Sequence, residues 1–269
     1  MTSATQPIEY VDRIPSGHYG FGNAARMEWV KLRTLRSSMW ALLFFVVSMI
    51  SLGVLTMAKT GAPSPADAQQ FDPTNNLLVG VALGQLIIGA IGVLVTAGEY
   101  SSGTMRSTLA AIPDRRLLLV AKAAVFGGVA LVVGEIVAVI TFFAGRVALT
   151  DAVPALRLSD PGVLRAVLMS GAYLALVGLI GLGLGAIVRH TASAIGALVG
   201  VTFVLPLIAA GVAGFEVSKF FPTMIAGNSM LVTKPVHEAL SPWTGFAMMC
   251  LYTAVTLCVG SWVLARRDA

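Results

Sequence analysis

Charged residues are scarce in this chain: Asp, Glu, Lys and Arg make up only 12% of its 269 residues, while hydrophobic residues make up 57%. An ordinary soluble domain has about 25% charged residues. A single soluble core of this size could not hide so much apolar surface behind so few charges. The composition therefore argues against a soluble enzyme.

Cysteine and histidine are scarce as well. The two cysteines, Cys250 and Cys258, lie in one apolar stretch, where a helix would separate them by about 12 Å, too far for a disulfide bond. The three histidines, His18, His190 and His237, fall in three different loops. This pattern has no spacing typical of a metal site, and we expect none.

The sequence does contain six apolar stretches of about 20 residues, each long enough to cross a bilayer. They are residues 38–58, 77–97, 123–144, 166–187, 191–214 and 243–264. Every charged residue except Glu135 lies outside them. We therefore predict an all-α, polytopic membrane protein, with residues 38–264 as the transmembrane domain and tails at 1–37 and 265–269.

The basic residues predict an orientation. If the N-terminus is inside, twelve of the 18 Lys and Arg residues fall in inner segments, which is the excess that the positive-inside rule describes. We expect both termini in the cytoplasm and the protein in the cell membrane. The basic residues lie beside span ends, where anionic headgroups attract them, so lipid is an expected partner and nucleic acid is not. Residues 1–37 contain no apolar run typical of a cleaved signal peptide.

Residues 21–36 are predicted to form an amphipathic helix at the inner membrane interface, with a plain juxtamembrane anchor as the alternative. Apolar residues recur there at helical spacing, and the basic side chains would snorkel toward water while a tryptophan sits at headgroup depth. The residues assigned to this interfacial helix are Arg26, Trp29, Lys31, Arg33 and Arg36.

The loop at 98–122, between the second and third spans, is longer than a simple connection needs. A serine can cap a short helix there, on which Met105, Leu109 and Ile112 share one face, and Pro113 ends it. An apolar stripe this small is not buried by its own helix. It is expected either to lie on lipid or to dock into a partner protein.

The outer loop at 215–242 is unusually apolar, and Pro222, Gly227 and Pro235 divide it. This predicts one or two short helices that pack against the protein. In the fifth span, Pro206 lacks the backbone donor that a regular helix needs, so a kink is predicted. That kink is interpreted either as a fixed bend for packing or as a hinge.

These features together resemble the ABC-2 type transporter permeases, particularly the small stand-alone permeases of high-GC bacteria. The resemblance rests on MEWVKLRTLRSSMW before the first span, GEYSSGTMRSTLAAIPDRR between the second and third, and the long outer loop. It implies that residues 21–36 are a connecting helix and residues 104–112 a coupling helix against an ATP-binding-cassette ATPase subunit. It also implies a homodimer or heterodimer of permeases with two ATPase subunits, which would bind the ATP and Mg²⁺, and no cofactor in this chain.

The resemblance, together with the loop pattern, suggests a set of ATPase-coupling residues. They are Glu99, Thr104, Met105, Arg106, Leu109 and Pro113. Within this set, Glu99 and Arg106 are expected either to pair with each other or to contact the ATPase. Arg115, Arg116 and Lys122 are expected instead to anchor the start of the third span at the headgroups.

A second set contains the candidates for a substrate pathway. They are Gln85, Glu135, Tyr173, Thr202 and Pro206. As the one ionisable residue in a span, Glu135 is expected either to line a pathway or to be a neutral, hydrogen-bonded structural acid. Gln85 and Tyr173 are its candidate partners.

The expected function is an export permease with no chemistry of its own. The chain has no G-x-x-x-x-G-K-[ST] phosphate loop, so ATP hydrolysis is expected on another polypeptide. The cargo is expected to be amphipathic, such as a drug, an antibiotic, a lipid or a peptide. A stand-alone secondary transporter or channel is the alternative, although it would be expected to show inverted repeats and several intramembrane charges. An intramembrane enzyme is disfavoured because no span contains a histidine and the sequence lacks H-E-x-x-H and G-x-S-x-G.

Overall fold

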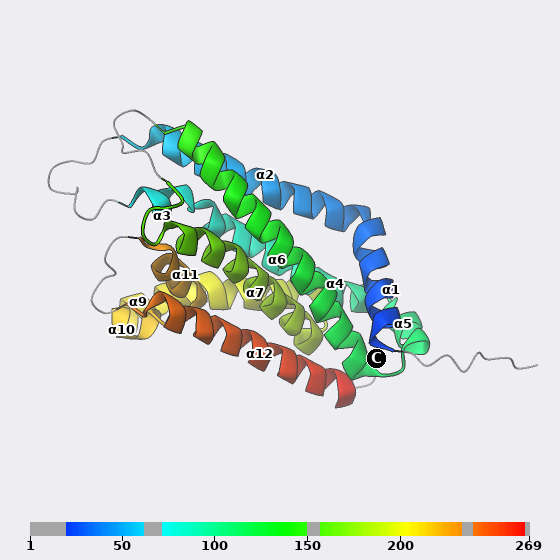
Figure 1. The fold of residues 1–269 in the computed structure, drawn as a ribbon. Helices are drawn as coiled ribbons and strands as arrows, with labels where there is room; N and C mark the ends of the chain where they lie inside the picture. The colour runs from blue at the N-terminus through cyan, green and yellow to red at the C-terminus, as the bar shows by residue number, and fades with distance from the viewer. Residues whose placement is uncertain (1–19, 62–71, 150–156, 233–238, 267–269) are drawn as a thin grey trace, which may run out of the picture.

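The computed structural model describes residues 20–61, 72–149, 157–232 and 239–266, and the regular elements in these ranges are all helical (Figure 1). Six of the helical segments are long and apolar enough to cross a membrane. They are α2 (Arg36–Lys59), α4 (Gly80–Ser101), α6 (Arg115–Val147), α7 (Val163–Val188), the segment Thr191–Ala213 and α12 (Pro242–Arg266). The predicted all-helical, six-span architecture is confirmed.

The third span begins earlier than predicted. Asp114 accepts hydrogen bonds from the backbone N–H groups of Arg116 and Leu117, each at 3.0 Å, and so caps α6 at its N-terminus. An aspartate cap of this kind fixes where a helix starts. Hydropathy placed the boundary at Lys122 because that residue is charged, but in the structure it lies inside the helix.

Short helices cluster at the two ends of the bundle. They are α1 (Phe21–Thr34), α3 (Pro73–Leu77), α5 (Met105–Ala111), α10 (Phe215–Ser218) and α11 (Pro222–Met230). Figure 1 shows α1 and α5 together at one end, with α3, α10 and α11 at the other. We refer to α10 and α11 as the outer lid, after the side of the membrane that the sequence predicted for this loop. They occupy the loop where the sequence predicted one or two short helices, while residues 233–238 of that loop lie outside the described residues.

The fifth span is interrupted, as Pro206 predicted. It consists of α8 (Thr191–Val199), a π-helical turn (Gly200–Val204) and α9 (Leu205–Ala213), with the proline in the first turn of α9. Proline has no backbone N–H to donate to the carbonyl one turn earlier. That carbonyl belongs to Thr202, and it accepts instead from the hydroxyl of Thr223 on α11. The interruption therefore gives the lid a hydrogen-bond acceptor in the fifth span.

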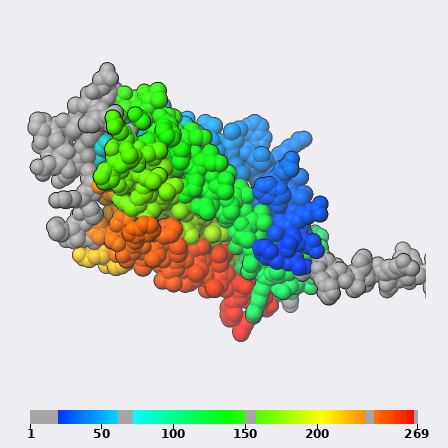
Figure 2. All heavy atoms as spheres, viewed as in Figure 1, coloured from blue at the N-terminus to red at the C-terminus, as the bar shows by residue number. Residues whose placement is uncertain are grey.

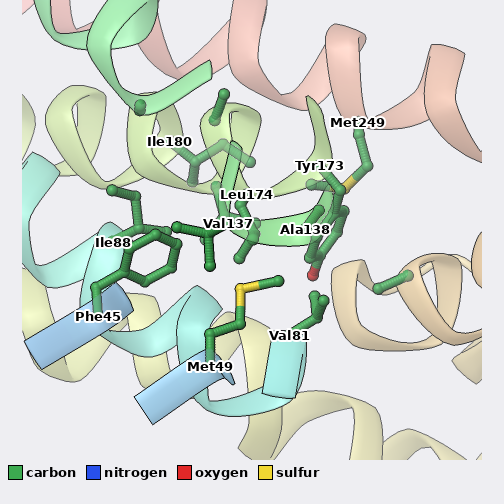
Figure 3. Packing of buried hydrophobic residues seen from close by; sticks show 14 of the residues in the cluster. Phe45, Met49, Val81, Ile88, Val137, Ala138, Tyr173, Leu174, Ile180 and Met249 are labelled. Atoms are coloured by element: carbon green, nitrogen blue, oxygen red, sulfur yellow. The ribbon is translucent and has the colours of Figure 1, made fainter. Parts of the chain in front are cut away.

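The core is formed around α7, which packs against α4, α6 and α12. Figure 3 shows side chains from α2, α4, α6 and α7, among them Phe45 and Leu174, interdigitating in this core. Between α4 and α7 the backbones themselves touch: a β-carbon on Gly92 would lie 2.0 Å from the carbonyl oxygen of Gly178. Glycine allows helices in a membrane to approach this closely, so α4 and α7 form a tightly joined pair.

Candidate coupling site and polar core

The helix predicted to contact an ATPase, α5, lies beside α1 and α6. Its Met105 is only 2% exposed and packs in a small cluster with Ala24 of α1 and Leu118 of α6. The apolar stripe of α5 is therefore covered by its own chain, because α1 supplies the surface that the short helix could not provide alone. This corrects the expectation that Met105 docks into a partner, and Leu109 packs partly against the same cluster.

The face of α5 that remains open is polar or small. Thr104, Arg106, Ser107 and Ala110 are exposed, as is Pro113 after the helix. A partner protein approaching this end of the bundle would meet these residues first.

Four charged side chains meet where α1, α4 and α6 converge. Lys122 donates to Glu28 Oε2 at 2.9 Å and to Glu99 Oε1 at 2.6 Å. Lys31 donates to Glu28 Oε1 at 3.2 Å and to Glu99 Oε1 at 2.8 Å. It also donates to the hydroxyl of Thr108 at 3.1 Å, which ties in α5. We call Glu28, Lys31, Glu99 and Lys122 the four-charge cluster.

Burial makes this cluster different from a surface ion pair. The side chain of Lys122 is 1% exposed and that of Glu28 is 4% exposed, while Lys31 at the rim is 30% exposed. Two acids and two bases give the cluster no net charge. Removing one member would leave a buried charge without its partner, which is strongly destabilising. The cluster therefore fixes α1 and α5 against the ends of α4 and α6.

Two sequence-based expectations are wrong here. Glu99 pairs with Lys31 and Lys122, and none of the ion pairs among the described residues joins it to Arg106. Lys122 does not lie at the headgroups, because it is buried behind α1. Glu28 was missed altogether, although its spacing of three residues from Lys31 is the usual one for an ion pair along a helix.

The other residues of the predicted interfacial helix are exposed. Arg26, Trp29 and Arg33 lie on the exposed face of α1, away from the bundle, and Arg36 begins α2. Lys31 is the exception, since it turns toward the four-charge cluster. Thus α1 has one face fixed to the bundle and another that remains open.

A chain of polar contacts crosses the bundle near the outer lid. Tyr173 on α7 donates its hydroxyl to Gln85 on α4. The amide of Gln85 donates to the hydroxyl of Thr223 at 3.4 Å, and Thr223 donates to the carbonyl of Thr202. We call these four residues the polar core. Thr223 was not predicted, since nothing in the sequence indicates that a lid threonine reaches a span.

The members of the polar core are buried within the protein in this conformation. Gln85, Tyr173 and Thr202 are each at most 3% exposed. Three of the five predicted pathway residues are therefore brought together, and Pro206 follows them on the fifth span. Their polar groups satisfy one another, as buried polar groups in a membrane protein must.

Glu135, the fifth predicted pathway residue, is not part of the polar core. It packs against the backbone of α7 at Gly171, where an added β-carbon would come within 2.8 Å of the α-carbon of Glu135. Among the described residues, no hydrogen bond joins it to Gln85 or Tyr173, which bond to each other instead. The expectation that these two residues are its partners is therefore wrong, and the carboxyl group lies at the α6–α7 seam.

Arginine fixes the outer lid to the bundle. Arg165 on α7 donates to the carbonyl oxygen of Ser229 at 2.7 Å and to that of Leu231 at 2.8 Å. A cation at the carboxyl end of α11 satisfies carbonyls that the helix leaves free. Asp72, which caps α3, accepts from the backbone N–H of Val232 at 2.6 Å. The lid is thereby held from two sides.

Comparison with known proteins identifies one family that matches this chain. A family model described as "ABC-2 family transporter protein" matches residues 24–215, well over half of the chain. The matched region includes most of α1, the four-charge cluster and the first five spans. None of the curated proteins compared with the chain matches it.

Proposed function

Because the chain belongs to the ABC-2 family of transporter membrane proteins, we propose that it is the permease of an ATP-driven exporter. A membrane domain of this family has no ATPase activity. ATP and Mg²⁺ are bound by a separate ATP-binding-cassette subunit, and a second permease copy, identical or related, completes the transport unit. Both termini lie in the cytoplasm, the end of the bundle that carries α1 and α5 faces the cytoplasm, and the complex resides in the cell membrane.

The observation that carries this proposal is the attachment of α5. Its apolar stripe, its Thr108 and the four-charge cluster link it to α1 and to the cytoplasmic ends of α4 and α6. A movement applied to the open face of α5 therefore displaces these ends together, because the buried contacts between them are costly to break. This is what a coupling helix must do to turn motion of an ATPase into motion of the spans.

The polar core and outer lid supply the opposite gate. With the lid closed, Gln85, Tyr173 and Thr202 are bonded among themselves and to Thr223. When the lid moves, these groups face the space between the spans and become available to cargo. Since Glu135 is the one ionisable residue well inside the spans, the cargo is amphipathic, in the class of drugs, antibiotics, lipids and hydrophobic peptides.

Co-purification and transport test the proposal directly. Tagged chain is purified in mild detergent from its own host, and the associated ATP hydrolysis is measured. We expect an ATPase subunit to be retained by the wild type and lost with Arg106→Glu, which reverses a charge on the open face of α5. Arg33→Glu changes another exposed arginine, on α1; it is the matched control and retains the ATPase subunit.

Two results would overturn the proposal. One is a purified chain that never retains an ATP-hydrolysing subunit. The other is vectorial transport by the chain reconstituted alone, at a rate that nucleotide does not change, since this would indicate a stand-alone secondary transporter or channel.

A further inference from the structure

A groove lies between the open face of α1 and the neighbouring part of α6, whose atoms adjoin in the space-filling view (Figure 2). It has a volume of about 630 Å³ and is lined by Ala25, Arg26 and Trp29 of α1 and, from α6, by Val125, Gly128, Val129, Val132 and Val133. Those from α6 are valines and a glycine, Gly128, beyond whose α-carbon there is open space. Along α6 the groove extends for about 12 Å, at 1.5 Å per residue.

The lining of the groove is almost entirely apolar, and its one charged residue, Arg26, borders it at α1 beside Trp29. Arg26 is exposed and makes no ion pair with any described residue. A cation above an apolar floor matches a phospholipid, whose phosphate is negative and whose acyl chain is apolar. A second transmembrane helix without an acidic residue would cover the valines but would leave the arginine unpaired.

We propose that this groove binds one anionic phospholipid of the leaflet that contacts α1. Its phosphate pairs with the guanidinium of Arg26, and one acyl chain lies along residues 125–133 of α6, beside Gly128. Trp29 closes the side of the site at headgroup depth, where tryptophan is favoured. The proposal does not depend on the direction of transport or on the cargo.

The site has a consequence for α1. The opposite face of the same helix carries Glu28, which pairs with the buried Lys122. The lipid therefore contacts one face of α1, while the four-charge cluster fixes the opposite face to the bundle. A membrane rich in anionic lipid stabilises the docked position of α1, because a ligand that binds only this arrangement shifts the population toward it.

Quenching of Trp29 fluorescence by brominated acyl chains tests the binding. The chain contains four tryptophans, and the other three are replaced in the variant Trp40→Phe, Trp243→Phe, Trp262→Phe. The protein is reconstituted in vesicles containing equal mole fractions of brominated phosphatidylglycerol or brominated phosphatidylcholine. We expect about a fivefold preference for the anionic lipid, the effect of one basic residue near the membrane surface.

Matched variants separate a site from ordinary lipid contact. Arg26→Gln abolishes the preference, whereas Arg33→Gln, on the same helix but outside the groove, keeps it. Gly128→Leu fills the groove and reduces quenching by both lipids. Gly211→Leu is its control, because Gly211 also faces open space but does not line the groove.

Three outcomes would overturn the proposal. The first is equal quenching by the two lipids. The second is loss of the preference with Arg33→Gln to the same extent as with Arg26→Gln. The third is a change of oligomeric state with Gly128→Leu and no change in quenching, which would show that a second chain occupies the groove. Native mass spectrometry of the unmodified wild type gives an independent measure, with retained phosphatidylglycerol expected and its absence counting against the site.

Discussion

Replacing Lys122 by methionine tests the four-charge cluster most directly. Methionine has a similar length but no charge, so the substitution removes the ion pairs to Glu28 at 2.9 Å and to Glu99 at 2.6 Å. Lys31, which is 30% exposed, is then the only cation beside two carboxylates. Breaking a buried ion pair by removing one partner costs about 3–5 kcal/mol. We expect a loss of this size in the free energy of unfolding.

A double variant and an exposed pair provide the controls. Adding Glu28→Gln to Lys122→Met restores charge balance, because Glu99 and Lys31 remain paired, and much of the lost stability should return. Lys219→Met removes the partner of Glu216 and a contact with the Phe220 ring, in a pair where the side chain of Glu216 is 65% exposed and that of Lys219 is 16% exposed. An exposed pair contributes about 0–1 kcal/mol, so the same chemical change should have little effect there.

The measurement is SDS-induced unfolding in mild detergent, followed by circular dichroism. The reasoning is refuted if Lys122→Met is no more destabilising than Lys219→Met. It is equally refuted if Glu28→Gln adds its own full loss to that of Lys122→Met, because residues that act in one cluster must not behave independently.

Three other substitutions test the helix packing, the polar core and the outer lid. Gly92→Ala places a β-carbon 2.0 Å from a carbonyl oxygen of α7 and should lower the melting temperature in size-exclusion assays, with a cost of about 1–3 kcal/mol or more. Gly196→Ala, which faces open space, should not, and a similar loss would contradict the packing argument. Tyr173→Phe removes the donor to Gln85 and should cost about 1–3 kcal/mol in the same assay, so an unchanged melting temperature would count against the polar core. Arg165→Met should speed hydrogen exchange in α11 but not in α4, and equal protection of α11 in both proteins would show that the arginine does not hold the lid.

The spans and short helices could be predicted because the signals for them are local. Apolar length defines a membrane helix, and Pro113 and Pro206 act within a turn of where they stand. The boundary that was misplaced furthest, at Lys122, failed because a charged residue ended the apolar window. Local composition cannot show that a lysine is neutralised by a distant partner.

The four-charge cluster and the polar core could not be predicted for the same reason. Glu28 and Lys122 are 94 residues apart in the sequence, and Gln85 and Thr223 are 138 apart. Such pairs depend on how the helices pack, which one sequence does not reveal. The scarcity of charged residues offered a hint, because a carboxylate near the end of so apolar a helix needs a partner. The sequence suggested Arg106 as a partner for Glu99 because it is the nearest arginine along the chain.

The four-charge cluster and the polar core both include residues of α4, and this shared helix links them mechanically. Glu99 lies in the last turn of α4 and Gln85 in its second turn, so about 21 Å of helix separate them. Along this length α4 touches the backbone of α7 at Gly92, and Gly181 of α7 similarly approaches the carbonyl of Gly89. Close packing of this kind resists bending or sliding of one helix alone. A displacement at the four-charge cluster must therefore move α4 and α7 together, and with them the Gln85–Tyr173 hydrogen bond to which the lid is attached.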